Sequence, residues 1–160
     1  DQINLEKLYL RNNALKMLKY KALRGLKKLE YLDLSFNELI FIERNSFYGI
    51  KGLQSLDLKF NMLKNIDLNI FDNLFGFSSS LDLSNNQINN IYSTSSKKIH
   101  IDILCLGNNY LTDLNNFLIY FGSLRNLHIS NNLIKKIEFN IDVQLLNFLD
   151  LSGNNIEKIN

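Results

Sequence analysis

Residues 29–37 read LEYLDLSFN, one copy of the phrase L-x-x-L-x-L-x-x-N, in which x is any residue. The phrase or a near variant occurs seven times, at intervals of 22 to 25 residues, and each copy ends on an asparagine. These asparagines are Asn13, Asn37, Asn61, Asn86, Asn109, Asn132 and Asn154. A regular period of this length indicates a solenoid, in which each repeat forms one turn of a coil.

The alternating leucines of each phrase predict a short strand with one buried face. Strands of successive repeats should pair in parallel, about 4.8 Å apart. The asparagine at the end of each phrase can satisfy backbone groups in the following turn, so we assign all seven a structural role and no ligand. In the returns, Phe47 and Phe71 recur at the same place, with Leu23 one repeat earlier, and should stack in the core.

The phrase identifies a leucine-rich repeat protein, and it covers nearly the whole chain. We therefore predict an α/β-type solenoid: a leucine-rich repeat horseshoe of seven repeats, with a parallel β-sheet on the concave face and irregular or short helical returns on the convex face. Residues 1–160 should form a single domain. The first phrase starts at Leu5 and the last return reaches Ile159, so we expect a fragment that lacks one or both caps.

The fourth repeat is degenerate. Ser78 stands where the first leucine of the phrase belongs, and the return that follows, residues 92–98, is rich in serine and has no aromatic anchor. These features predict a looser, bent or more mobile stretch in the middle of the solenoid; it could act as a hinge or a binding loop, or it could be a local irregularity alone.

Composition excludes several functions. A net charge of +2 is too small to indicate nucleic acid or membrane as the main partner, and no stretch approaches the length of a transmembrane helix. No nucleophile has a paired base, and no glycine-rich phosphate loop occurs, so we predict no enzymatic activity. Cys105 and His128 should be neighbours on adjacent strands, but with only His100 nearby they do not make a metal site. We therefore expect neither a metal nor a cofactor.

Outward positions of the strands should line the concave face, where a partner would bind. Three consecutive repeats place a carboxylate at the central outward position, namely Asp33, Asp57 and Asp82, about 5 Å apart by strand spacing. They could favour a basic partner, or they could form a solvated ladder with mutual effects on their pKa values. The first 28 residues are also rich in basic side chains, which form either a solvated outer surface or a docking patch for an acidic partner.

Two phenylalanines, Phe36 and Phe60, directly precede the phrase asparagine in adjacent repeats. The other five repeats have polar or small residues at this position: Asn12, Asn85, Asn108, Asn131 and Gly153. This contrast predicts an exposed aromatic pair that binds a partner, flanked by Tyr9, Tyr31, Lys59 and Arg11. The alternative is that the two rings simply pack on each other at the edge of the strands.

The first three repeats resemble Toll-like receptor ectodomains and many secreted animal proteins. The second half, with its LTD…LxxFxxL return at Leu111, Thr112, Asp113, Leu118, Phe121 and Leu124, resembles the secreted leucine-rich immune proteins of mosquitoes. That resemblance implies a non-enzymatic, extracellular protein that acts with a complement-like thioester protein. The coiled coil and cysteine-rich region of those proteins have no counterpart in these residues.

From these observations we predict a non-catalytic protein-binding scaffold in extracellular innate immunity. It would bind through the concave face or an edge of the solenoid. The partner would be a complement-like thioester protein or a second leucine-rich repeat protein. The alternative is a ligand-sensing ectodomain fragment of a Toll-like membrane receptor, which the sequence beyond residue 160 would reveal through a transmembrane segment.

Overall fold

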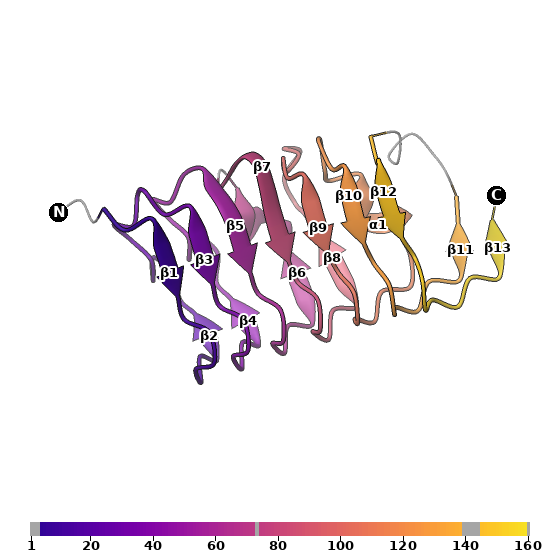
Figure 1. Cartoon of the computed structure of the whole chain (residues 1–160), viewed down its shortest axis with the longest axis horizontal. Coiled ribbons are helices and arrows are strands. Elements are labelled where there is room, and N and C mark those ends of the chain that lie inside the picture. The colour runs from indigo at the N-terminus through magenta and orange to yellow at the C-terminus, as the bar shows by residue number, and fades with distance from the viewer. Residues whose placement is uncertain (1–3, 73, 139–144, 160) are drawn as a thin grey trace.

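A computed structural model describes residues 4–72, 74–138 and 145–159 of the chain. The chain winds into a solenoid whose seven main strands form one parallel sheet (Figure 1). In spatial order the strands are β1 (Lys7–Tyr9), β3 (Tyr31–Asp33), β5 (Leu53–Asp57), β7 (Phe75–Asp82), β9 (Ile103–Cys105), β10 (Asn126–His128) and β12 (Phe148–Asp150). We call the outward side of this sheet the sheet face; it is the face predicted to be concave.

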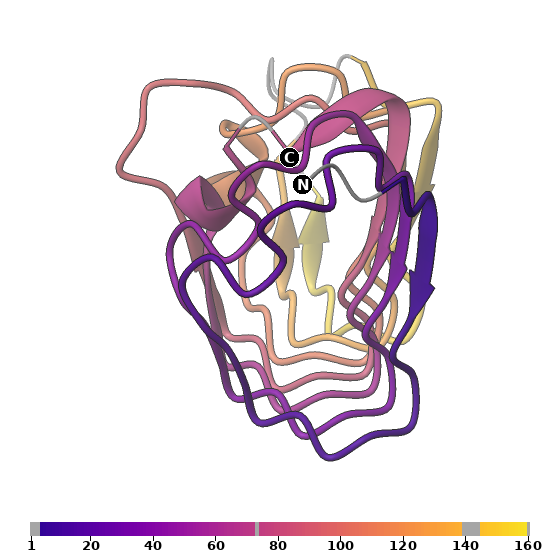
Figure 2. The same cartoon turned by 90° about the vertical axis from the view of Figure 1, so that its left-hand side faces the viewer.

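The rest of each turn contains shorter elements. Three two-stranded parallel sheets pair β2 (Met17–Leu18) with β4 (Phe41–Ile42), β6 (Asn65–Asp67) with β8 (Asn90–Tyr92), and β11 (Lys136–Ile137) with β13 (Lys158–Ile159). The described returns contain two short helices, a 3-10 helix η1 (Leu68–Phe71) and α1 (Asn115–Leu118). Figure 2 looks along the coil and shows the seven-stranded sheet on one side, with the returns facing it. The predicted leucine-rich repeat solenoid is therefore confirmed.

The phrase leucines form the core, as their spacing predicts. Leu32 pairs in register with Leu8 on one side and with Leu56 on the other, and its side chain is fully buried. Burying such a side chain contributes about 1.5–3 kcal/mol, and the solenoid repeats this gain at every turn. The rings of Phe47 and Phe71 lie 6.0 Å apart and are both buried, which confirms the predicted aromatic packing in the returns.

The phrase asparagines connect neighbouring turns by hydrogen bonds. Asn109 is buried; its amide nitrogen donates to the carbonyl oxygens of Leu83 at 3.0 Å and Leu106 at 3.1 Å. Its side-chain oxygen accepts from the backbone N–H of Ile88 at 2.8 Å. One side chain thus satisfies backbone groups of two repeats that would otherwise be buried without partners. Equivalent bonds are formed by Asn37, Asn61, Asn86, Asn132 and Asn154.

The degenerate fourth repeat is locally irregular, as its sequence predicts. It contains β7, the longest of the described strands at 8 residues, with a register shift that pairs Phe75 with Leu53. Phe75 packs against the core, with its ring 5.7 Å from that of Phe71. A Cβ on Gly76 would lie 3.1 Å from the Cα of Gly52, a tight contact, so the close approach of the two backbones here favours glycine.

The serine-rich return after β8 is bonded to the return before it. Ser93 donates its hydroxyl to the side-chain oxygen of Asn69 at 3.0 Å, and the backbone N–H of Ser95 donates to the same oxygen at 3.1 Å. Polar side chains thus replace the missing aromatic anchor in this turn. Within the described residues, no helix has the length and apolar character needed to cross a membrane.

Candidate functional site

The residue before each phrase asparagine has a left-handed backbone conformation. At Phe36 and Phe60 φ is 53°, and the other repeats have positive φ values at Asn12, Asn85, Asn108, Asn131 and Gly153. The conformation lets the backbone N–H bond to the next repeat: Phe36 N–H donates to Lys59 O at 3.0 Å, and Phe60 N–H to Ser84 O at 3.1 Å. Asparagine and glycine tolerate it, whereas a residue with a bulky side chain loses about 1–2 kcal/mol. Two phenylalanines therefore occupy positions whose backbone conformation favours asparagine or glycine.

The two rings form a stack that includes an arginine from the first repeat. The rings of Phe36 and Phe60 are 4.2 Å apart between centroids and tilted by only 22°. The Cζ atom of Arg11 lies 4.2 Å from the centroid of Phe36. Since the three residues come from consecutive repeats, Phe36 lies between the guanidinium of Arg11 and the ring of Phe60. We call these three residues the aromatic stack.

The aromatic stack combines packing with exposure. Phe60 keeps 42% of its surface exposed, Arg11 is exposed and Phe36 is half-buried. An exposed cation–π contact contributes about 0.5–1 kcal/mol, and an aromatic pair about 0.5–1.5 kcal/mol. Together these gains do not exceed the cost of about 1–2 kcal/mol for the left-handed backbone at each of the two phenylalanines, so the stack adds little to folding. The sequence leaves open whether these rings pack on each other or face a partner, and the geometry has them do the first while remaining accessible.

Tyr9 and Tyr31 lie on β1 and β3, with ring centroids 5.1 Å apart. Tyr9 is 61% exposed, while Tyr31 is half-buried. Burial raises the pKa of the Tyr31 phenol, and the nearby carboxylates of Asp33 and Asp57 raise it further. The sheet face therefore presents a second aromatic pair near its N-terminal end, with Tyr9 as the accessible member.

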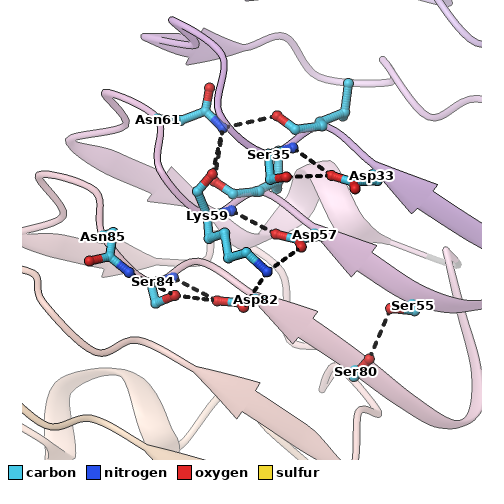
Figure 3. Close-up of polar contacts among 12 residues, drawn as sticks. Asp33, Ser35, Ser55, Asp57, Lys59, Asn61, Ser80, Asp82, Ser84 and Asn85 are labelled. Carbon is cyan, nitrogen blue, oxygen red and sulfur yellow. Dashed lines mark hydrogen bonds and ion pairs between the residues drawn. The ribbon is translucent and has the colours of Figure 1, made fainter. Parts of the chain in front are cut away.

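The carboxylates of the sheet face are occupied by local hydrogen bonds (Figure 3). One oxygen of Asp33 accepts from the backbone N–H of Ser35 at 2.9 Å and from its hydroxyl at 2.6 Å. Asp82 accepts the same pair of bonds from Ser84. An aspartate that accepts from the residue two places on stabilises the turn that ends the strand. Asp33 is only 6% exposed, so at this position the carboxylate is buried in its turn rather than solvated.

Lys59 offsets the repulsion expected between the carboxylates. Its ammonium Nζ lies 2.8 Å from one oxygen of Asp57 and 4.0 Å from one of Asp82 (Figure 3). The hydrogen bond to Asp57 is the main cause that raises the pKa of Lys59. Among the described residues, no three histidine, cysteine or acidic side chains are arranged to hold a metal ion.

The central outward position changes character in the second half of the sheet. Cys105 and His128 are in register on β9 and β10, as their spacing predicts, and the ring of His128 lies 4.6 Å from that of Phe148. Burial, followed by the charge of Asp82, raises the pKa of the Cys105 thiol to about 11. A thiol with so high a pKa is neutral at physiological pH and is a poor nucleophile.

Sequence reasoning missed two features of this surface. The first is the left-handed backbone beneath Phe36 and Phe60; its signal is the asparagine or glycine in the other five repeats, which we interpreted only as exposure. The second lies in the basic N-terminal region, where the ammonium of Lys21 is 4.8 Å from the ring centroids of both Tyr20 and Tyr48. The sequence pattern does not indicate which way a long lysine side chain points, so it could not predict this contact with the two tyrosine rings.

Comparisons with known proteins agree with this fold. The leucine rich repeat family matches residues 3–63 of the chain. The leucine-rich repeat domain of mosquito APL1 is 28% identical, with a TM-score of 0.67, and the match covers 95% of this chain and 44% of that one. A structure of the LRIM1/APL1C complex is also 28% identical, with a TM-score of 0.69, and the match covers 96% of this chain and 31% of that one. The chain is thus a leucine-rich repeat solenoid that resembles these mosquito proteins.

Other similar structures show how widely the fold is used. A plant ice-binding protein is 28% identical, with a TM-score of 0.65 and coverage of 94% of this chain and 49% of that one. A complex of TLR13 with ssRNA13 has a TM-score of 0.70 at 22% identity, covering 94% of this chain and 24% of that one, and so shares the fold alone. This chain spans less than half the length of each of these structures. No curated protein sequence matches it.

Proposed function

We propose that this chain is a non-catalytic protein-binding scaffold of extracellular innate immunity, and that a partner docks at the aromatic stack, in the turns that follow β1, β3 and β5. The observation that carries the proposal is that phenylalanine occupies positions 36 and 60 on a left-handed backbone, which the other repeats adopt at lower cost with asparagine or glycine. Local strain of this kind concentrates at functional sites. Exposed aromatic and arginine side chains are also the residues that contribute most to binding energy at protein interfaces.

The surroundings of the stack support binding and offer no catalytic set. The carboxylates of Asp33 and Asp57 are buried or paired, and the thiol of Cys105 is neutral. The stack itself presents a guanidinium and two aromatic rings. Such a surface buries well against another protein, and it has no activated nucleophile or base with which to start a reaction.

Similarity to APL1 and to the LRIM1/APL1C complex supports the immune setting. In this proposal the chain is secreted, and its partner is a complement-like thioester protein or a second leucine-rich repeat protein. The Toll-like receptor alternative has weaker support, because the TLR13 structure is similar in fold alone.

The direct test measures binding of the chain to a purified complement-like thioester protein and to a purified leucine-rich repeat protein of the APL1 type. We expect binding to one of them, weakened by about tenfold or more in the double variant Phe36→Asn/Phe60→Asn, a change of about 1.4 kcal/mol. The matched control is Asn131→Gly, at the same backbone position but outside the stack, which should leave affinity within about twofold. Binding that is unaffected by the double substitution would contradict the site, and no binding to either protein would contradict the partner class.

A further inference from the structure

The aromatic stack ends in a cation, Arg11, for which the described residues provide no counter-ion. Arg11 is exposed and forms no ion pair with any residue that the structure describes. The other cation nearby, Lys59, is held by Asp57 and Asp82. Arg125, farther along the sheet, lies 3.8 Å from the carboxylate of Asp102. Arg11 is therefore the one of these three cations whose charge is left for a partner.

Stacking prepares this guanidinium for one kind of ligand. Its Cζ atom lies over the ring of Phe36, 4.2 Å from the centroid, and the side chain is exposed. A planar guanidinium donates two parallel hydrogen bonds to a carboxylate, and a guanidinium that is already oriented loses less entropy on forming them. Arg11 thus presents a group suited to a carboxylate, and the exposed ring of Phe60 lies on the other side of Phe36.

We propose that the partner contributes an extended peptide segment with an acidic side chain opposite Arg11 and an apolar side chain against Phe60. This inference rests on the proposed function, because it assumes that the aromatic stack binds protein. In an extended chain, residues i and i+2 point to the same side and lie about 7 Å apart. The Cζ atom of Arg11 and the ring centroid of Phe60 each lie 4.2 Å from the centroid of Phe36, so they are at most about 8 Å apart, and an acidic-x-apolar sequence running along the solenoid matches that span.

Charge favours a carboxylate over a nucleic acid. A nucleic-acid backbone carries one phosphate per nucleotide and needs a groove of several free cations. Around the stack, Lys59 is already neutralised by two carboxylates, and Asp33 adds a further negative charge. A single unpaired guanidinium suits a ligand with a single carboxylate next to an apolar group, and a polyanion would meet the aspartates as well.

The test uses the full chain, labelled with 15N, and three blocked hexapeptides with the cores Glu-Ala-Phe, Gln-Ala-Phe and Glu-Ala-Ala. Titration is followed by NMR at the side-chain N–H of Arg11 and the backbone N–H of Phe60. We expect the Glu-Ala-Phe peptide to bind with a Kd of about 1 mM and to shift both signals. Each of the other two peptides should have a Kd at least about fivefold higher, since each lacks one of the two contacts.

Variants assign the effect to Arg11. In Arg11→Gln the difference between the Glu and Gln peptides should disappear, and Arg11→Lys should restore only part of it because an ammonium lacks the planar fork. Arg125→Gln, which removes an arginine already paired with Asp102, should leave the difference unchanged. Far-ultraviolet circular dichroism checks that each variant keeps its fold, as expected for substitutions at exposed side chains.

Two results would overturn the inference. One is equal binding of the Glu and Gln peptides to the unmodified chain, including no binding of either. The other is a single-stranded oligouridine that shifts the same signals at lower concentration than the Glu-Ala-Phe peptide. If the peptides fail while protein binding still depends on Phe36 and Phe60, the acidic-x-apolar motif is wrong and the proposed function stands. If protein binding ignores both phenylalanines, the proposed site itself fails.

Discussion

Repeats two and three differ from repeats four to six in the side chain that precedes the phrase asparagine. Phe36 and Phe60 stand in the first group where Asn85, Asn108 and Asn131 stand in the second, and all five have φ between 53° and 56°. The backbone is the same, so the difference lies in the side chains alone. Asparagine relieves the left-handed conformation, whereas phenylalanine strains it and gains an exposed stacking surface. The leucines and phrase asparagines therefore determine the fold, whereas the residue before each phrase asparagine can vary and can contribute to a binding surface.

After Asn13, the phrase asparagines form the same hydrogen bonds between repeats in both halves of the solenoid and so stabilise the same backbone in each. Substituting one of them in the interior should therefore have the largest effect. Asn109→Ala removes the amide that bonds Leu83 and Leu106 and leaves buried backbone groups without partners, so we expect a loss of about 3 kcal/mol in the free energy of unfolding. Urea denaturation measures it.

The control for this prediction is Asn13→Ala. Asn13 is exposed and donates only within its own repeat, to Leu10 and Arg11. Its removal should cost about 1 kcal/mol or less. Equal losses at Asn13 and Asn109 would show that the ladder does not connect the repeats energetically.

A second difference between the halves concerns the central outward position, where Cys105 follows the aspartates. With a pKa of about 11 in place of 9.0, Cys105 should react with iodoacetamide at pH 8 about a hundredfold more slowly than an unfolded thiol. Because the folded state binds the thiol proton more tightly, stability should fall as pH rises from about 9 to about 11. Alkylation in the folded chain at the rate seen in urea would contradict the burial of this group.

A phenylalanine placed at the equivalent position of a later repeat tests the cost of the left-handed backbone directly. Asn131→Phe puts a phenylalanine on a left-handed backbone without a partner ring or an arginine, so we expect a loss of about 1–2 kcal/mol in the free energy of unfolding. Asn131→Gly introduces no strain, because glycine adopts the left-handed conformation readily, and it should change the free energy of unfolding by less than about 0.5 kcal/mol. A phenylalanine tolerated at this position without loss would remove the argument from strain.

The smallest effect concerns the charge balance beside the stack. Lys59→Met removes the cation shared by Asp57 and Asp82, and we expect a loss of no more than about 1 kcal/mol because the pair is partly solvated. The pKa of Lys59 is raised above 10.5, so its contribution is fully present below that pH and is lost as pH rises through the folded value. Thermal unfolding at pH 7 in low and high salt measures it, with Lys51→Met as the control; a loss of several kcal/mol would mean that the carboxylates are far less solvated.

Most of the fold could be predicted from the phrase, because burial of leucines every second residue and pairing of identical repeats follow from period alone. The register shift in β7 could not, since it depends on Phe75 replacing a missing leucine across a bulge. For the site, the sequence indicates which residues lie on the sheet face. It does not reveal that Asp33 bonds its own turn or that Arg11 turns onto Phe36, since both depend on side-chain directions that the pattern leaves open.

The most direct test measures stability and binding together in the double variant Phe36→Asn/Phe60→Asn. Relief of the left-handed backbone, about 1–2 kcal/mol per residue, should offset the lost stacking of about 0.5–1.5 kcal/mol and the lost cation–π contact. The account predicts a free energy of unfolding within about 1 kcal/mol of the unmodified chain or above it, together with the loss of partner binding. A variant that loses more than about 2 kcal/mol of stability and still binds its partner unchanged would show that the aromatic stack is a packing element and would contradict the account.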